Sequence, residues 1–163
     1  MNTTIVAQKL VSLFRETRFE TAISELFATN IISIEPTTAN LVNETLTTGV
    51  STETTSSMNT VVTNTVSNNI TEGVNVLVTE GITNVIAKYN NLTSLVSEFH
   101  NVWVSEPIIV DNFFSFTLKM DVTHTILGRT TIEELCVYNV VEGKIVREQL
   151  FFTPSNVLVP SEN

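Results

Sequence analysis

Two glutamates near the end of the chain, Glu133 and Glu148, have the setting that most clearly suggests chemistry. They lie in residues 131–141 and 144–153, where apolar and polar side chains alternate in the pattern of antiparallel strands. Glu142-Gly143 between these segments fits a two-residue hairpin turn, because glycine tolerates the positive φ that such turns require. The two carboxylates are therefore expected on neighbouring strands.

The turn also predicts which residues share a face. With Val141 opposite Lys144, residues that pair directly point to the same side of the sheet. One face then holds Glu133, Asn139 and Glu148 among Leu135, Val137, Val146, Leu150 and Phe152. We expect this face to be the dry one, continuous with the apolar positions of a strand over 113–123. The outer face then carries charged residues, Glu134 and Arg147 among them, that form ion pairs.

A carboxylate enclosed by apolar side chains has its pKa raised and becomes a usable base near neutral pH. Glu148 is the candidate base on this argument. His100 is the candidate proton donor or orienting group, because it shares its parity with Val102 and Val104 in a predicted strand over 100–111, and its ordinary pKa of about 6.5 suits proton transfer. The alternative for Glu148 is a carboxylate at the rim that only contacts water. The alternative for His100 is a structural histidine held by hydrogen bonds.

Two more side chains are expected to line the same cavity as Glu133 and Asn139. Glu35 ends a short β-prone run over 30–36, and Tyr89 lies on the apolar stripe of a helix predicted over 81–99. The alternative for Glu35 is an exposed carboxylate at the rim. The alternative for Tyr89 is a core tyrosine whose hydroxyl is hydrogen-bonded. Helices over 3–16 and from Thr17 onward, with the 81–99 helix, are expected to cover the inner face of the sheet.

Composition excludes several classes of function. Eight Lys and Arg without a cluster, and a net charge of −9, are unsuited to nucleic acid, which basic side chains bind by displacing counterions. One cysteine and two separated histidines give no disulfide and predict no metal site. The five glycines form no phosphate-binding loop, so no nucleotide cofactor is expected. No signal peptide or apolar run of about 18 residues is seen, so we expect a cytoplasmic protein without a membrane contact.

The chain is expected to form a single domain over 1–163, with an unusual insertion and a short tail. Residues 37–72 are rich in Thr, Asn, Ser and Val and have no helical period. They are either a disordered insertion or an extended β arm whose edges pair with another chain. A strand is predicted over 74–79, and the tail 154–163 is expected to be loose or to lie over a surface.

The ordered pattern resembles a known family. The residues that carry the resemblance are Ile34-Glu35-Pro36, Gly81 at the start of the long helix, Phe114-Ser115-Phe116, Met120 to Thr123, Gly128-Arg129, Glu133-Glu134 with Tyr138, and Gly143 to Gln149. Together they resemble the SnoaL-like branch of the nuclear transport factor 2-like superfamily. The resemblance implies an α+β cone, a strongly curved antiparallel sheet around N-terminal helices and one long helix. It also implies an interior cavity and, commonly, a homodimer through the outer sheet face.

Relatives in this superfamily include polyketide cyclases and ketosteroid isomerase, which move protons with pocket carboxylates or histidine. No acid/base pair here matches those enzymes position by position, so no catalytic role is carried over. The first functional hypothesis is a pocket for a small, largely apolar molecule, with cofactor-free proton transfer, isomerisation or cyclisation. The second is a non-catalytic interaction or self-assembly module that uses the outer sheet face and the 37–72 arm to form a homodimer or higher homo-oligomer.

Overall fold

The computed structural model describes residues 2–37 and 75–152. Its elements in chain order are α1 (Thr3–Arg15), α2 (Phe19–Leu26), β1 (Phe27–Thr37), β2 (Asn75–Glu80), α4 (Ile82–Ser94), β3 (Val96–Val104), β4 (Ile108–Val110), β5 (Phe113–His124), β6 (Gly128–Val141) and β7 (Lys144–Phe151). Apart from Thr37, the predicted insertion 37–72 lies outside the described residues, as does the tail 154–163. In the described parts of the chain, no helix has the length and hydropathy needed to cross a membrane.

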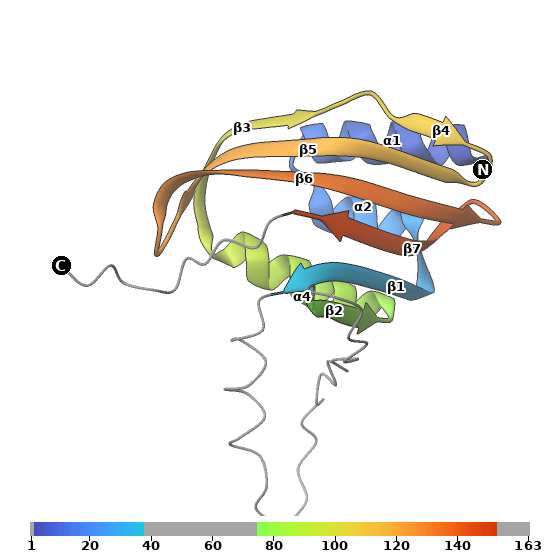
Figure 1. The fold of residues 1–163 in the computed structure, drawn as a ribbon, viewed down its shortest axis with the longest axis horizontal. Coiled ribbons are helices and arrows are strands. Elements are labelled where there is room, and N and C mark those ends of the chain that lie inside the picture. Colours follow the sequence, from blue (N-terminus) through green and yellow to red (C-terminus); the bar gives the residue numbers. More distant parts are fainter. Residues whose placement is uncertain (1, 38–74, 153–163) are drawn as a thin grey trace, which may run out of the picture.

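The strands form one seven-stranded sheet in the order β2-β1-β7-β6-β5-β3, with β4 paired to β5. All neighbours are antiparallel except β1 and β7, which run parallel. Figure 1 shows the sheet curving across the molecule, with α1 and α2 behind it and α4 alongside β1 and β2. The predicted α+β class, with a curved sheet around N-terminal helices, is confirmed.

The core lies between the N-terminal helices and the sheet. Helix α1 begins where the Asn2 side chain accepts a hydrogen bond from the Ile5 amide at 3.0 Å. The ring of Phe14 on α1 packs edge-on against Phe116 of β5 at a centroid distance of 5.9 Å. Phe114 stacks on Tyr138 of β6 at 4.9 Å. Each such buried side chain contributes about 1.5–3 kcal/mol, so this aromatic cluster fixes the sheet on the helices.

The predicted hairpin turn is confirmed, but the register beyond it is not. Glu142 and Gly143 have φ values of 51° and 77°, which is the type I′ geometry, and Val141 pairs with Lys144. The register then shifts between Val140 and Asn139, because Val140 pairs with Ile145 and Asn139 with Arg147. One extra residue in β7, Val146, is a β-bulge.

This bulge reverses the predicted inner face of β6. The buried β6 residues are Cys136, Tyr138 and Val140, whereas Leu135 is 41% exposed. The expectation that Leu135, Val137, Glu133 and Asn139 face inward is therefore wrong for β6. It holds for Glu148 and Leu150 of β7, which are buried, because the bulge restores them to the inner side.

The helix predicted over 81–99 is too long. Helix α4 ends at Ser94, and Val96 to Val104 form β3, which pairs with β5. The β pairing to a neighbouring strand overrides the helical spacing of Val96 and Phe99, a tertiary effect that spacing alone does not report. The strand predicted over 74–79 is confirmed as β2, and the helix over 3–16 as α1.

Candidate functional site

Glu148 is the centre of a buried polar cluster. Its side chain has no exposed surface. One carboxylate oxygen accepts a hydrogen bond from the Ser33 hydroxyl at 2.6 Å, and the other accepts one from the Tyr89 hydroxyl at 2.9 Å. The first oxygen is also 3.5 Å from the Lys88 ammonium. Ser33 and Glu148 are paired residues of β1 and β7, so both point to the same side of the sheet.

Lys88 joins Glu148 to a second carboxylate. Its ammonium lies 3.0 Å from Oε2 of Glu35 and donates to the Ser33 hydroxyl at 2.6 Å. Only 11% of the Lys88 side chain and 14% of the Glu35 side chain are exposed. Burial lowers the pKa of Lys88, but the charges of Glu148 and Glu35 outweigh this effect and raise it. Lys88 is therefore a cation at neutral pH and not a nucleophile.

A third carboxylate, Glu134, belongs to the same cluster. It shares the inward parity of Cys136 and Tyr138 on β6. Burial, together with the negative charges of Glu148 and Glu35, raises the pKa of Glu134 to about 7, although Lys88 opposes the shift. Three carboxylates against one ammonium leave an excess of negative charge, and protonation of Glu134 relieves it.

The neighbouring thiol and hydroxyls are protonated at neutral pH. Burial, followed by the charge of Glu148, raises the pKa of Tyr89 well above its ordinary value. Burial and Glu134 do the same to the pKa of Cys136, and burial and Cys136 to that of Tyr138. Tyr89 is thus available as a hydrogen-bond donor, whereas Cys136 is not a thiolate nucleophile.

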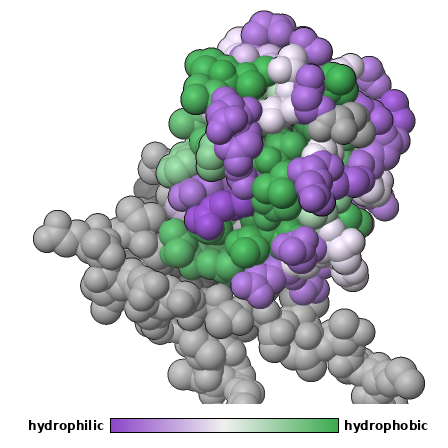
Figure 2. All heavy atoms as spheres, turned by 90° about the vertical axis from the view of Figure 1, so that its right-hand side faces the viewer, coloured by the Kyte–Doolittle hydropathy of each residue, from purple (hydrophilic) through white to green (hydrophobic). Residues whose placement is uncertain are grey.

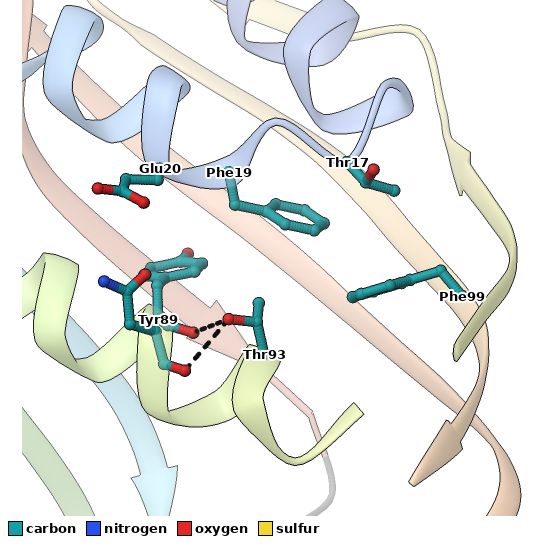
Figure 3. Close-up of a pocket in the computed structure, with 7 residues that line it drawn as sticks. Thr17, Phe19, Glu20, Tyr89, Thr93 and Phe99 are labelled. Carbon is teal, nitrogen blue, oxygen red and sulfur yellow. Dashed lines mark hydrogen bonds between the residues drawn. The ribbon is translucent and has the colours of Figure 1, made fainter. Parts of the chain in front are cut away.

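A surface depression lies beside this cluster. Its volume is about 220 Å³, and its walls are Thr17, Phe19, Glu20, Tyr89, Asn90, Thr93 and Phe99. Figure 3 shows these side chains around the opening, with Phe19 and Glu20 from α2 facing Tyr89 and Thr93 from α4. Tyr89 belongs to both features, because its ring lines the depression and its hydroxyl binds Glu148.

The structure brings together three of the six residues singled out from the sequence, Glu148, Glu35 and Tyr89. Two others lie on the outer side of β6. Glu133 is 64% exposed and 3.9 Å from Lys119. The Asn139 amide donates to the backbone oxygen of Asn112 at 3.3 Å.

His100 is not brought to Glu148 either. Its Nε2 lies 2.7 Å from the Thr123 hydroxyl, and its Nδ1 lies 3.6 Å from the Glu98 carboxylate. Its strand β3 is separated from β7 by β5 and β6. Three strand spacings of about 4.8 Å put the two backbones roughly 14 Å apart. Bulges in β3 shift its register and disrupt the simple alternation on which the predicted orientation of His100 rests.

Lys88, Ser33 and Glu134 are the cluster residues that sequence reasoning missed. Lys88 comes three residues after the buried Val85 and next to Tyr89, a spacing that puts it on the covered side of α4. That spacing was a usable signal. Ser33 shares its strand parity with Glu35 and could have been found with it. No spacing in the sequence places Glu134 in the cluster, because the bulge in β7 decides which face of the sheet Glu134 is on.

Comparisons with known proteins agree with this architecture. The sequence model of the SnoaL-like domain matches residues 62–152, more than half of the chain. The chain belongs to the SnoaL-like family. No curated protein is significantly similar to it in sequence. The predicted family is thus confirmed for this SnoaL-like protein, and small-molecule binding is typical of the family.

Solved structures show the same fold at low sequence identity. A SnoaL-like protein of Mesorhizobium loti superposes with a TM-score of 0.64 at 20% identity, over 93% of this chain and all of the other. A nuclear transport factor 2-like protein of Burkholderia pseudomallei superposes with a TM-score of 0.59 at 14% identity, over 94% of this chain and 92% of the other. A Catenulispora acidiphila protein with a ketosteroid isomerase-like fold was solved in complex with trimethylamine. It superposes with a TM-score of 0.57 at 8% identity, over 94% of this chain and 88% of the other.

Proposed function

We propose that this SnoaL-like protein binds a small, largely apolar molecule against Tyr89 and transfers a proton on it without a cofactor. The observation that carries the proposal is the double role of Tyr89. Its ring lines the depression, and its hydroxyl donates a hydrogen bond to the buried Glu148 at 2.9 Å. A ligand in the depression would therefore contact Tyr89, whose hydroxyl reaches the buried Glu148 carboxylate.

Glu148 is the proposed base in this scheme. Because Glu148 is buried and does not line the depression, it would take a proton from a carbon next to a carbonyl group by way of Tyr89. The Tyr89 hydroxyl would pass its own proton to Glu148 and accept the proton of the ligand. Once protonated, Glu148 no longer needs the hydrogen bond from Tyr89, so the Tyr89 hydroxyl becomes available to the oxyanion that forms on the ligand. Lys88 and Ser33 hold Glu148 in place before the transfer.

Glu134 supports this chemistry through its own titration. Its pKa of about 7 means that it carries a proton in about half of the molecules at neutral pH. A protonated Glu134 lowers the negative charge of the cluster around Glu148. His100 has no part in the proposal, because it lies on the far side of β5 and β6.

The test is the exchange of the α-protons of 2-tetralone with D2O, followed by proton NMR. We expect exchange above the buffer rate with the unaltered protein and a return to the buffer rate with Glu148→Gln. Glu133→Gln is the matched control, because it removes an exposed carboxylate on the outer face of β6, and it should leave the rate unchanged. Exchange by a folded Glu148→Gln variant at the unaltered rate would remove Glu148 from the mechanism. No exchange by the unaltered protein would count against proton transfer.

A second proposed role is self-association through the outer sheet face. Leu135 and Phe151 are directly paired and both are exposed, and Trp103 is exposed two strands away. Exposed apolar side chains also gather at the end of the sheet that carries β4 and the β6–β7 turn (Figure 2), where Ile108 and Val110 are exposed. Exposed apolar side chains on a sheet face support a protein contact, and a second copy of this chain is the proposed partner.

Light scattering after size-exclusion chromatography tests the association. We expect a dimer mass for the unaltered protein and a monomer mass for Leu135→Glu. Ile126→Glu is the control, since Ile126 is also apolar and is more exposed than Leu135, but it lies between β5 and β6 rather than on the sheet face. A monomer mass for the unaltered protein contradicts the proposal. Deletion of 40–72 tests the predicted arm, and an unchanged mass would clear it of any role in assembly.

A further inference from the structure

The walls of the depression are rich in aromatic rings. Phe19, Tyr89 and Phe99 come from three different elements, and the rings of Phe19 and Phe99 lie 6.0 Å apart with an angle of 39° between their planes. The faces of such rings attract cations, and most strongly cations that are poorly hydrated. Aromatic walls also accept a neutral apolar group, so the charges around them decide between the two.

The last turn of α4 adds partial negative charge on one side. Asn90 and Thr93 line the depression near the end of this helix, which has no basic residue in its last turn. The helix dipole places partial negative charge at a helix C-terminus, and this charge attracts cations. The Thr93 hydroxyl donates to the backbone oxygens of Tyr89 and Asn90 at 3.0 and 3.2 Å (Figure 3).

The opposite wall is the start of α2, whose N-terminus alone would favour an anion. Glu20 in its first turn offsets this, and Glu20 is one of the residues that line the depression. Among the described residues Glu20 forms no ion pair. The negative charge of Glu20 is therefore available to a ligand.

The nearby cations are already matched. Lys88 lies 5.1 Å from the centre of the Tyr89 ring, but its charge is paired with Glu35 and Glu148. Arg18, next to Phe19 in the chain, pairs with Glu16 at 3.4 Å. The depression is thus bounded by aromatic rings, a helix C-terminus and Glu20, which has no ion-pair partner among the described residues.

We infer that the depression receives an alkylated ammonium group, so that the ligand is a largely apolar molecule with a positively charged end. The inference rests on the proposed function, because it names the ligand class of the same depression. An alkylated ammonium fits better than a primary one, since alkyl groups contact the rings and weaken hydration. A volume of about 220 Å³ accommodates a group of this size with a short chain.

Choline chloride is the probe, and 3,3-dimethylbutan-1-ol, in which carbon replaces the nitrogen, is its neutral control. Binding of each to the full chain is measured by saturation-transfer NMR titration at low and high salt. We expect choline to bind at least about tenfold more tightly than the alcohol. Glu20→Gln should weaken choline binding by roughly threefold to tenfold and leave the alcohol unaffected. Glu80→Gln is the matched control, because Glu80 is exposed and precedes the other end of α4.

The outcomes separate this inference from the proposed function. Equal binding of choline and the alcohol overturns the cation preference and leaves an apolar binding site standing. Binding of neither compound, or choline binding that Glu20→Gln and Glu80→Gln weaken equally, overturns the assignment of the depression as a cation site. 2-Tetralone contains no ammonium group, so the result of the exchange assay concerns proton transfer alone.

Discussion

The two faces of the sheet carry the same kinds of charged residues in opposite surroundings. On the outer face, Lys119 and Glu133 lie 3.9 Å apart, and both side chains are more than half exposed. On the inner face, Lys88 lies between Glu35 and Glu148, and all three are almost enclosed. Water screens the first pair, which contributes about 0–1 kcal/mol at most. Because Lys88, Glu35 and Glu148 are buried, their charges have a much larger effect on the stability of the fold and on the pKa values of neighbouring groups.

The adjacent residues Glu133 and Glu134 show the contrast most directly. They are neighbours in sequence and differ only in the face of β6 to which they point. Glu133 lies in water beside Lys119, whereas burial and the nearby charges of Glu148 and Glu35 raise the pKa of Glu134 to about 7. The face of β6 on which a glutamate lies therefore decides its surroundings, although the residue type is the same.

The largest expected effect comes from removal of the buried cation. Lys88→Met leaves Glu35 and Glu148 without their partner, and we expect a loss of about 3–5 kcal/mol in the free energy of unfolding near neutral pH. Urea unfolding followed by circular dichroism measures it. Lys119→Met on the outer face is the control, with an expected loss below about 1 kcal/mol; equal losses in the two variants would contradict the comparison.

A smaller effect of opposite sign is expected for Glu134→Gln. The folded-state pKa of about 7 is above the ordinary value of 4.5, so the unfolded chain loses this proton first as the pH rises. Glu134 therefore reduces stability progressively between about pH 4.5 and 7, by up to about 3 kcal/mol above that range. The variant should be more stable than the unaltered protein at pH 8 and nearly equal to it at pH 4.

Urea unfolding at several pH values checks this, with Glu133→Gln as the matched variant. Glu133→Gln should change stability by less than about 0.5 kcal/mol at pH 8. A Glu134→Gln variant that is less stable than the unaltered protein at pH 8 would show that the Glu134 carboxylate is stabilised in the fold.

The smallest effect is expected from Tyr138→Phe. The Tyr138 hydroxyl is buried, and its oxygen has no hydrogen-bond partner among the described residues. Removal of an unpaired buried hydroxyl should stabilise the fold by about 1 kcal/mol, or roughly 2–4 °C in Tm. Thermal unfolding measures the change, and a fall in Tm of that size would mean that the hydroxyl has a partner in solution.

The fold could be predicted from the sequence wherever local rules decide the structure. The Glu142-Gly143 turn, the alternation in β5 and the apolar face of α1 all follow from residue type and spacing. The family resemblance added the curved sheet around the helices, which the comparisons confirm. The end of α4 could not be predicted, because pairing of β3 with β5 is a long-range contact.

Only part of the candidate site could be predicted, for one physical reason. A single extra residue in β7, Val146, moves all pairing beyond it by one position. Glu148 stayed on the inner face, but Glu133 and Glu134 exchanged sides. No feature of the sequence marks Val146 as a bulge. Glu35 was found because it lies beyond the register shift of β1, which falls between Phe27 and Ile32, and Tyr89 was found because it lies on a helix.

The central claim is that the inner face encloses a group that titrates near neutral pH. The most direct measurement is a carbon-13 NMR titration of the glutamate side-chain carboxyl groups, with Glu134 assigned by comparison with Glu134→Gln. We expect the Glu134 carboxyl signal to move with a midpoint at about pH 7. A midpoint near the ordinary value of 4.5 would mean that Glu134 lies in water, and would contradict the account.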